Sequence, residues 1–319
     1  MNKLIEKILK RDEFIDQPPV LIDIGASGAI DAKWKALAKH SICLAFDADD
    51  REFGYVANEN KGYKKLYVFN CVVTDSDSTE TDFFLTSSPF CSSVLHPDNK
   101  SLRVWSFAEK FNVDKKVKLK ARSLSSLLAE LNIKYVDWFK TDSQGTDLRL
   151  FLNIDESIRN KCIAAEFEPG IIDAYVGEDK LFKVFEVMNG PNFWLADMVV
   201  KGTQRISPSE LDTISKNKLM KKLISESMKV SPCWGELTYL NTFNNSFSIR
   251  EYLLGWIFSM IMEQYGFSYH IALNGKQLFG DPIFDELIAN SKSNILTNVV
   301  KLKFYRAVIG KIKKILRIQ

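Results

Sequence analysis

Residues 19–28 read PVLIDIGASG, an apolar run that ends in an acid and a short loop with two glycines. An uninterrupted apolar segment of this length is typical of a strand that is buried on both faces of a parallel sheet. Glycines after such a strand let the backbone approach a ligand closely and leave amide groups available to it. The stretch therefore predicts the first strand of a Rossmann-like α/β sheet, with a ligand site at its carboxyl end.

The same pattern recurs along the chain, with a short helical segment (DAKWKALAKH) between the first two apolar runs. Further strands are expected at residues 42–47, 66–73, 117–123, 135–142, 162–168, 193–200 and 235–241. Strands that alternate with helices favour an α/β fold. We expect a mostly parallel sheet with an antiparallel edge strand, and helical extensions at both ends of the chain.

Three segments are expected: an N-terminal helix (1–18), a ligand-binding domain (19–242) and a helical C-terminal extension (243–319). Within the domain, residues 202–232 are polar and are interpreted as an insertion with one helix near 209–228. The last nineteen residues (301–319) carry seven Lys or Arg and no acid, with apolar residues on one helical face. This tail either contacts an anionic membrane surface peripherally or docks its apolar face on the domain.

Composition excludes several classes of protein. The net charge of +3 comes from 43 basic and 40 acidic residues, which is too balanced to indicate a nucleic-acid partner. The five cysteines form no close pair and the three histidines form no zinc motif, so we expect buried thiols and no metal. The N-terminus lacks the apolar stretch of a signal peptide, and the most apolar run, 252–262, is too short to cross a bilayer. A cytoplasmic location is expected, with peripheral contact at the inner face of the membrane as an option.

Polar residues follow the predicted strands. Asp23 stands two residues before a GxxG loop, whereas a dinucleotide fingerprint would read GxGxxG. An acid there would repel a pyrophosphate and attract the cationic end of S-adenosylmethionine (SAM). Asp47 ends the second strand 24 residues later, where an acid can bind the ribose hydroxyls of a nucleotide-like cofactor. Lys140, Asp142 and Gln144 follow a later strand, and carboxyl ends of parallel strands share one cleft.

These motifs resemble those of the FkbM-type methyltransferases, a family with a class I SAM-dependent fold. The family's DxGAxxG, FEPxP, SSL and LKIDxEGxE motifs are matched by Asp23, Gly25, Ala26 and Gly28; by Phe46, Asp47 and Asp49; by Ser92, Ser93 and Val94; and by Phe139, Lys140, Thr141, Asp142, Gln144, Gly145 and Asp147. An acidic strand comparable to IAAEFE, with Glu166 and Glu168, also follows in the family. The resemblance covers roughly residues 19–242, and the LKIDxEGxE-like motif is the specific one.

The chain departs from the family pattern at four places. Asp47 replaces a Glu, which shortens the reach to a ribose, and the FEPxP prolines are replaced by Ala48 and Asp50. Gln144 replaces an acid, so any role that needs a charge there is in doubt. Asp147 is shorter than the usual Glu. These departures indicate a divergent branch with a different substrate.

The resemblance implies in-line methyl transfer from SAM to a hydroxyl of a small or glycan-type acceptor, a reaction that mainly requires alignment and a general base. Cofactor contacts are expected from Asp23, Gly25, Ala26, Ser27, Gly28, Asp47, Ala48 and Asn70. Catalytic candidates are Asp142 as the base, Lys140 as its orienting partner and His96 as a second base. Acceptor contacts are expected from Ser93, Gln144, Glu166 and Glu168.

Alternatives remain at this stage. An NAD-dependent sugar-nucleotide oxidoreductase would use the same kind of sheet, although GxGxxG is missing. A binding or scaffold protein could have kept the fold and lost catalysis. Lys140 and Asp142 could form a structural ion pair, and Glu166 or Glu168 could pair with a nearby cation.

Overall fold

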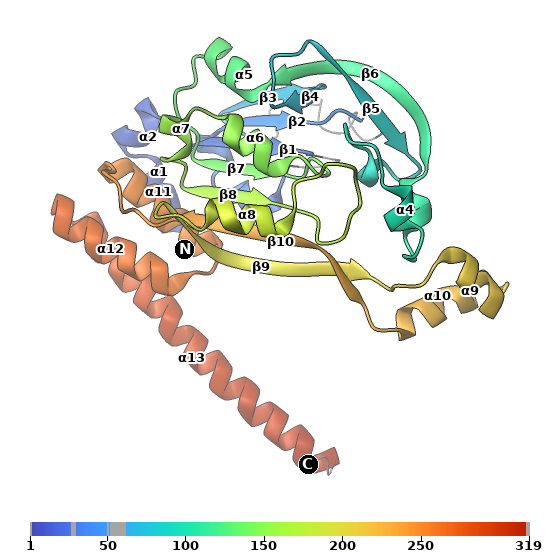
Figure 1. Ribbon diagram of the computed structural model, residues 1–319. Coiled ribbons are helices and arrows are strands. Elements are labelled where there is room, and N and C mark those ends of the chain that lie inside the picture. Colours follow the sequence, from blue (N-terminus) through green and yellow to red (C-terminus); the bar gives the residue numbers. More distant parts are fainter. Residues whose placement is uncertain (1, 27–29, 50, 52–61, 317–319) are drawn as a thin grey trace. The chain divides into compact units, whose positions relative to one another are not determined.

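A computed structural model describes residues 2–26, 30–49, 51 and 62–316, of which residue 2 and residues 304–316 are described as backbone only (Figure 1). The chain divides into two compact units. One combines Met1–Arg11 with Ser246–Gln319, and the other is Asp12–Asn245. The expected boundary near residue 242 lies close to this division, but the first N-terminal helix belongs to the same unit as the C-terminal helices.

The larger unit is built on a seven-stranded sheet in the order β3-β2-β1-β7-β8-β10-β9. Its strands are β1 (Val20–Ile24), β2 (Ile42–Phe46), β3 (Lys65–Phe69), β7 (Trp138–Thr141), β8 (Ala164–Phe167), β9 (Phe193–Thr203) and β10 (Ser231–Asn241). The first five are mutually parallel, and β10 runs antiparallel to both β8 and β9. The expected mostly parallel α/β sheet is therefore confirmed.

The sequence predicted that the antiparallel strand lies at the edge of the sheet, and this prediction is wrong. β10 lies between β8 and β9, and β9 forms the edge. Burial explains this order, because residues 237–241 of β10 are all buried whereas β9 alternates between partly buried and exposed positions. A strand that is apolar on both faces is stable only with neighbours and helices around it.

A second, three-stranded sheet has the order β4-β6-β5, from β4 (Val72–Thr74), β5 (Glu80–Thr86) and β6 (Val113–Ser123). The single strand expected at 66–73 is divided here, because β3 ends at Phe69 and β4 pairs with β6 instead of β2. Three short helical segments connect β5 to β6: η3 (Pro89–Cys91), α4 (Asn99–Leu102) and η4 (Ala108–Phe111). These segments approach the carboxyl ends of the main strands.

Helices α5 (Leu124–Glu130), α6 (Asp147–Asn153) and α8 (Leu181–Met188) cover one face of the main sheet (Figure 1). Phe151 of α6 packs on Phe139 and Phe167 with ring centroids 5.2 and 5.3 Å apart. On the other face Trp34 meets the edge of Trp138, and the helix expected at 31–40 is two short 3-10 turns, η1 (Ala32–Ala36) and η2 (Ala38–His40). The short helices α2 (Asp12–Asp16) and α7 (Glu156–Arg159) complete this unit with the insertion.

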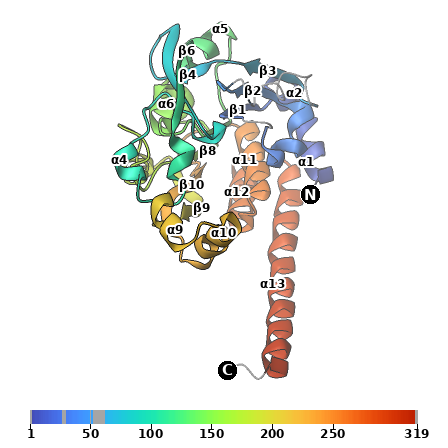
Figure 2. The same cartoon turned by 90° about the vertical axis from the view of Figure 1, so that its right-hand side faces the viewer.

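The insertion forms the tip of the β9–β10 hairpin, and both views place its helices side by side (Figures 1 and 2). It contains two helices, α9 (Pro208–Ile214) and α10 (Lys218–Ser227), instead of the single helix expected. Asn217 begins the second helix because its side chain accepts a hydrogen bond from the Met220 amide, which favours a new helix start.

The smaller unit contains α1 (Asn2–Leu9), α11 (Ile249–Ile261), α12 (Tyr265–Phe279) and α13 (Ile283–Leu316). Gly280 ends α12 with a left-handed φ of 65°, the conformation that glycine adopts readily at helix ends. α13 extends well beyond α11 and α12 (Figure 2). Its basic face lies outside the residues whose side chains are described, so membrane contact through 301–319 stays a prediction.

No helix among the described residues combines the length and apolar character that crossing a bilayer requires. All five cysteines are buried free thiols, as expected from their spacing.

Candidate functional site

A cleft opens where β1, β2 and β7 end, and it measures about 640 Å³ out to its mouth. It is lined by Ile24, Gly25, Phe46, Asp47, Ala48, Asp49, Cys71, Val72, Val73, Phe83, Pro89, Phe90, Ser92, Val94, Asp142, Ser143, Gln144 and Thr146. The strand order reverses between β1 and β7, so the chain leaves these two strands in opposite directions. Ligands of open α/β sheets bind at such a point.

Gly25 brings the first loop close to β7. Its φ is 83°, and a Cβ atom at this position would overlap the carbonyl oxygen of Asp142. The Gly25 and Ala26 amides both donate to the Phe46 carbonyl oxygen, at 2.9 and 3.0 Å. These two amides therefore hold the β1 loop against β2 and are not offered to a ligand, in contrast to the expectation. Ser27 and Gly28 lie outside the described residues.

Asp23 and Lys140 form an ion pair beneath the loop. They are register partners on β1 and β7, and Lys140 Nζ lies 2.9 Å from Asp23 Oδ1. The Asp23 side chain is fully buried, and neither residue lines the cleft. Burial lowers the pKa of Lys140, but the charge of Asp23 and its hydrogen bond outweigh this and raise the pKa overall. Lys140 therefore pairs with Asp23 instead of Asp142, and the pair supports the floor of the site.

We expect Asp23→Ala to destabilise the protein by about 3 kcal/mol or more, because it leaves a buried ammonium group without its counter-charge. The double variant Asp23→Ala/Lys140→Met should recover most of this loss. Urea unfolding of the two variants and the wild type measures both effects. Equal stability of Asp23→Ala and the wild type would show that the pair is not structural.

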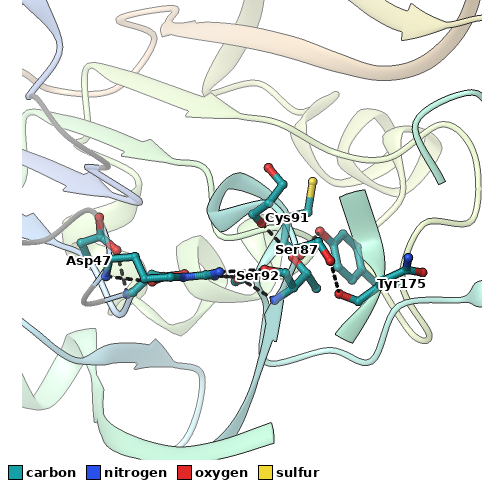
Figure 3. A network of polar contacts seen from close by, with 10 residues as sticks. Asp47, Ser87, Cys91, Ser92 and Tyr175 are labelled. Carbon is teal, nitrogen blue, oxygen red and sulfur yellow. Dashed lines mark hydrogen bonds and ion pairs between the residues drawn. The ribbon is translucent and has the colours of Figure 1, made fainter. Parts of the chain in front are cut away.

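The loop after β2 supplies the opposite wall. Asp47 Oδ1 accepts a hydrogen bond from the Asp49 amide at 2.9 Å, and Asp49 pairs with Arg51 at 2.6 Å. Arg51 also donates to the Thr86 carbonyl oxygen and to Ser92 Oγ, at 2.8 and 2.9 Å. Figure 3 shows this network from Asp47 to Ser92. The contact joins the two sheets, and no motif in the sequence pointed to Arg51.

Asn70 supports the same loop through a hydrogen bond to its backbone. Its exposed side chain donates to the Asp47 carbonyl oxygen at 3.2 Å and does not line the cleft. It positions Asp47 instead of contacting a ligand there.

A second cavity of about 1190 Å³, measured out to its mouth, adjoins the first. It is lined by Ser88, Phe90, Cys91, Phe107, Lys110, Phe111, Asp142, Gln144, Gly145, Glu168, Gly170, Ile172, Ala174, Tyr175, Glu178, Cys233, Trp234 and Glu236. Phe90, Asp142 and Gln144 line both cavities. The boundary between the two is thus formed by an aromatic ring, a carboxyl group and an amide.

The turn after β7 fixes this boundary. Gln144 and Gly145 adopt left-handed φ values of 57° and 109°. Gln144 Nε2 donates to Asp142 Oδ1 at 2.5 Å, and Ser93 Oγ donates to the Gln144 carbonyl oxygen at 2.7 Å. The Tyr175 hydroxyl lies 2.9 Å from both Gln144 Oε1 and the Cys91 carbonyl oxygen (Figure 3). An acid in place of Gln144 would face Asp142 with a like charge, whereas the amide donates to it.

Asp147 is an anchor within α6 and not a ligand group. One of its oxygens accepts hydrogen bonds from Thr141 Oγ1, the Ser143 amide and Ser143 Oγ, and the other accepts from the Glu168 amide at 2.7 Å. It thereby joins the turn after β7 to the end of β8. Burial raises the pKa of Asp147, although these hydrogen bonds oppose the shift.

Three carboxyl groups of the second cavity, those of Asp142, Glu168 and Glu178, have pKa values raised mainly by burial. Burial raises the pKa of Asp142 to about 6, with Asp147 adding to the shift while Lys140 and Gln144 oppose it. Burial raises the pKa of Glu168 to about 9, with further contributions from Asp142, Asp147 and Glu236. At neutral pH Asp142 is therefore mostly ionised and Glu168 carries a proton.

Three further predicted site residues, Glu166, His96 and Ser93, line neither cavity. Glu166 accepts the Trp138 indole N–H at 2.5 Å and pairs with Lys33 at 2.7 Å, and it lines neither cavity. Alternation along β8 places it on the face opposite Phe167, toward η1. His96 is exposed, packs its ring edge to face with Phe84 and also lines neither cavity. Ser93 is fully buried, and its hydroxyl positions Gln144 by donating to the Gln144 carbonyl oxygen.

Glu168 should make stability fall with rising pH. Its pKa is raised in the folded state, so the native protein binds more protons than the unfolded chain between about pH 4.5 and 9. We expect the unfolding free energy of the wild type, relative to Glu168→Gln, to fall by up to about 1.4 kcal/mol per pH unit in this window. Urea titrations at pH 5, 6, 7 and 8 measure the slope. Parallel curves for the two proteins would place the pKa of Glu168 at an ordinary value.

Comparisons with models of known protein families, with curated proteins and with solved structures each return no significant match. Within the described part of the chain, no three His, Cys, Asp or Glu side chains are grouped so as to hold a metal ion.

Proposed function

We propose that this chain is a SAM-dependent methyltransferase that binds its cofactor in the first cleft and its acceptor in the second cavity. The observation that carries the proposal is the position of Asp142, a carboxyl group in the wall shared by the two cavities. A methyl donor in one cavity and an acceptor in the other would meet beside it. The mostly parallel α/β sheet supports this reading, because ligands of such sheets bind at the carboxyl ends of the strands.

The first cleft fits a nucleoside-type cofactor. Asp47 lies at the end of β2, where an acid can accept hydrogen bonds from ribose hydroxyls. Ile24, Phe46 and Phe83 give apolar surface for a flat base. Gly25 keeps the cleft floor free of a side chain, and the absent GxGxxG pattern disfavours a dinucleotide.

SAM supplies an activated methyl group, so the protein must align the acceptor and remove its proton. Asp142 is ionised at neutral pH, so its carboxylate could take up the proton of an acceptor hydroxyl. The Gln144 amide holds Oδ1 of this carboxylate in place, and Tyr175 holds Gln144 in turn. Glu168 lines the same cavity and carries a proton at neutral pH in the free protein.

The cofactor assignment is tested by binding. We expect SAM and S-adenosylhomocysteine, but not NAD, to stabilise the protein in a thermal-shift titration. Asp47→Ala should weaken SAM binding about tenfold or more by calorimetry, because a charged acceptor of hydrogen bonds is lost. His96→Ala is the matched control and should bind SAM as the wild type does. Stabilisation by NAD alone would replace the proposal with an oxidoreductase.

The base is tested by Asp142→Asn, which keeps an oxygen to accept the Gln144 amide. We expect SAM affinity to persist while methyl transfer falls by about 100-fold or more. In the wild type, kcat/KM should rise with pH through about 6, because the base must lose its proton first. Full activity of the variant with an unchanged pH profile would exclude Asp142 as the base.

A further inference from the structure

The second cavity has a continuous aromatic side. Phe107 packs on Phe111 with centroids 5.2 Å apart, Phe111 meets Tyr175 at 5.6 Å, and Phe107 meets Trp234 at 6.5 Å. All four rings line the cavity. Such rings stack on the apolar faces of ring compounds, and their negative faces attract cations. They come from η4, from the segment after β8 and from β10, so only the folded chain brings them together.

The same cavity is also lined by carboxyl groups. Glu178 is paired with Lys180 at 2.8 Å, and Glu236 with Lys201 at 3.3 Å. Among the described residues, no Lys or Arg forms an ion pair with Glu168. The only cationic side chain in the described lining is that of Lys110. The cavity therefore has an excess of acid over base at the end occupied by Asp142 and Glu168.

We propose that the second cavity selects an acceptor with a ring and a protonated amine, that Glu168 binds the ammonium group, and that the aromatic side holds the ring. This inference rests on the proposed function, because it names the class of compound that reaches the shared wall. Among the described residues an ionised Glu168 has no ion-pair partner, and an ammonium group supplies one. An anionic ring compound would instead be repelled by the ionised Asp142.

Binding of this kind moves a proton. Glu168 carries one at neutral pH because of burial and the nearby acids Asp142, Asp147 and Glu236, with Lys140 opposing them; Glu178 and Lys110 are the other charged groups of the lining. When the ammonium group arrives, the Glu168 O–H bond breaks, its proton leaves to solvent, and the carboxylate accepts an N–H hydrogen bond. Close to one proton should be released per ligand bound at pH 7.

The test uses the full chain without SAM and three probes that share one ring but differ in charge: benzylamine, benzyl alcohol and benzoate. We expect calorimetry at pH 7 to show benzylamine binding about tenfold or more tightly than benzyl alcohol, and no binding of benzoate. The benzylamine enthalpy should vary with the ionisation enthalpy of the buffer, which reports the released proton. Equal affinity for the amine and the alcohol, tighter binding of benzoate, or no binding of any probe would overturn the proposal.

Two variants separate charge recognition from general effects on the cavity. Glu168→Gln should keep benzyl alcohol binding and lose both the preference for the amine and the proton release. Glu186→Gln, an exposed carboxyl group that pairs with Lys183 and lies outside the cavity lining, should keep both. An unchanged preference in Glu168→Gln would remove Glu168 from the proposal. Failure of SAM to bind while the amine preference persists would instead overturn the methyltransferase assignment alone.

Discussion

The junction of β1 with β7 is the constraint on which the site depends. There the buried Asp23 pairs with Lys140, and Gly25 lies against the Asp142 backbone. A side chain at position 25 would separate the two strands, and loss of either charge would leave the other buried and uncompensated. Because the chain diverges to opposite sides after these strands, the same junction opens the first cleft. The ion pair within the sheet is therefore structural. The groups that face the cleft, such as Asp142 and Gln144, belong to the turn that follows β7.

The residues that follow β7 and β8 are held in place by hydrogen bonds to one another. Asp147 fixes the turn after β7 to the end of β8, Gln144 holds Asp142, and Tyr175 holds Gln144. The Asp142 carboxyl group is thus oriented by Gln144, which itself lines both cavities. Burial and mutual repulsion then separate their pKa values, so that Asp142 is ionised and Glu168 protonated at the same pH.

The second sheet gives the site its outer wall. β4 leaves the main sheet after β3 and pairs with β6, which brings the β5–β6 connection over the strand ends. Arg51 links the loop after β2 to this connection through Thr86 and Ser92. Phe90 from the same connection separates the two cavities together with Asp142 and Gln144. A rearrangement of this connection would alter both cavities together.

The sequence by itself determined the α/β class, the positions of the main strands and the carboxyl-end location of Asp47, Asp142 and Gln144. Local apolar runs and glycine turns carry that information, because strand burial and loop conformation depend on neighbouring residues. It could not determine that Asp23 faces Lys140, that Glu166 faces Lys33, or that His96 points away from the cavities. Nor could it place β10 between β8 and the edge strand β9, or show that Arg51, Tyr175 and Trp234 lie at the site. These outcomes depend on pairing between segments far apart in the chain, and only the tertiary structure decides which buried charges and rings meet.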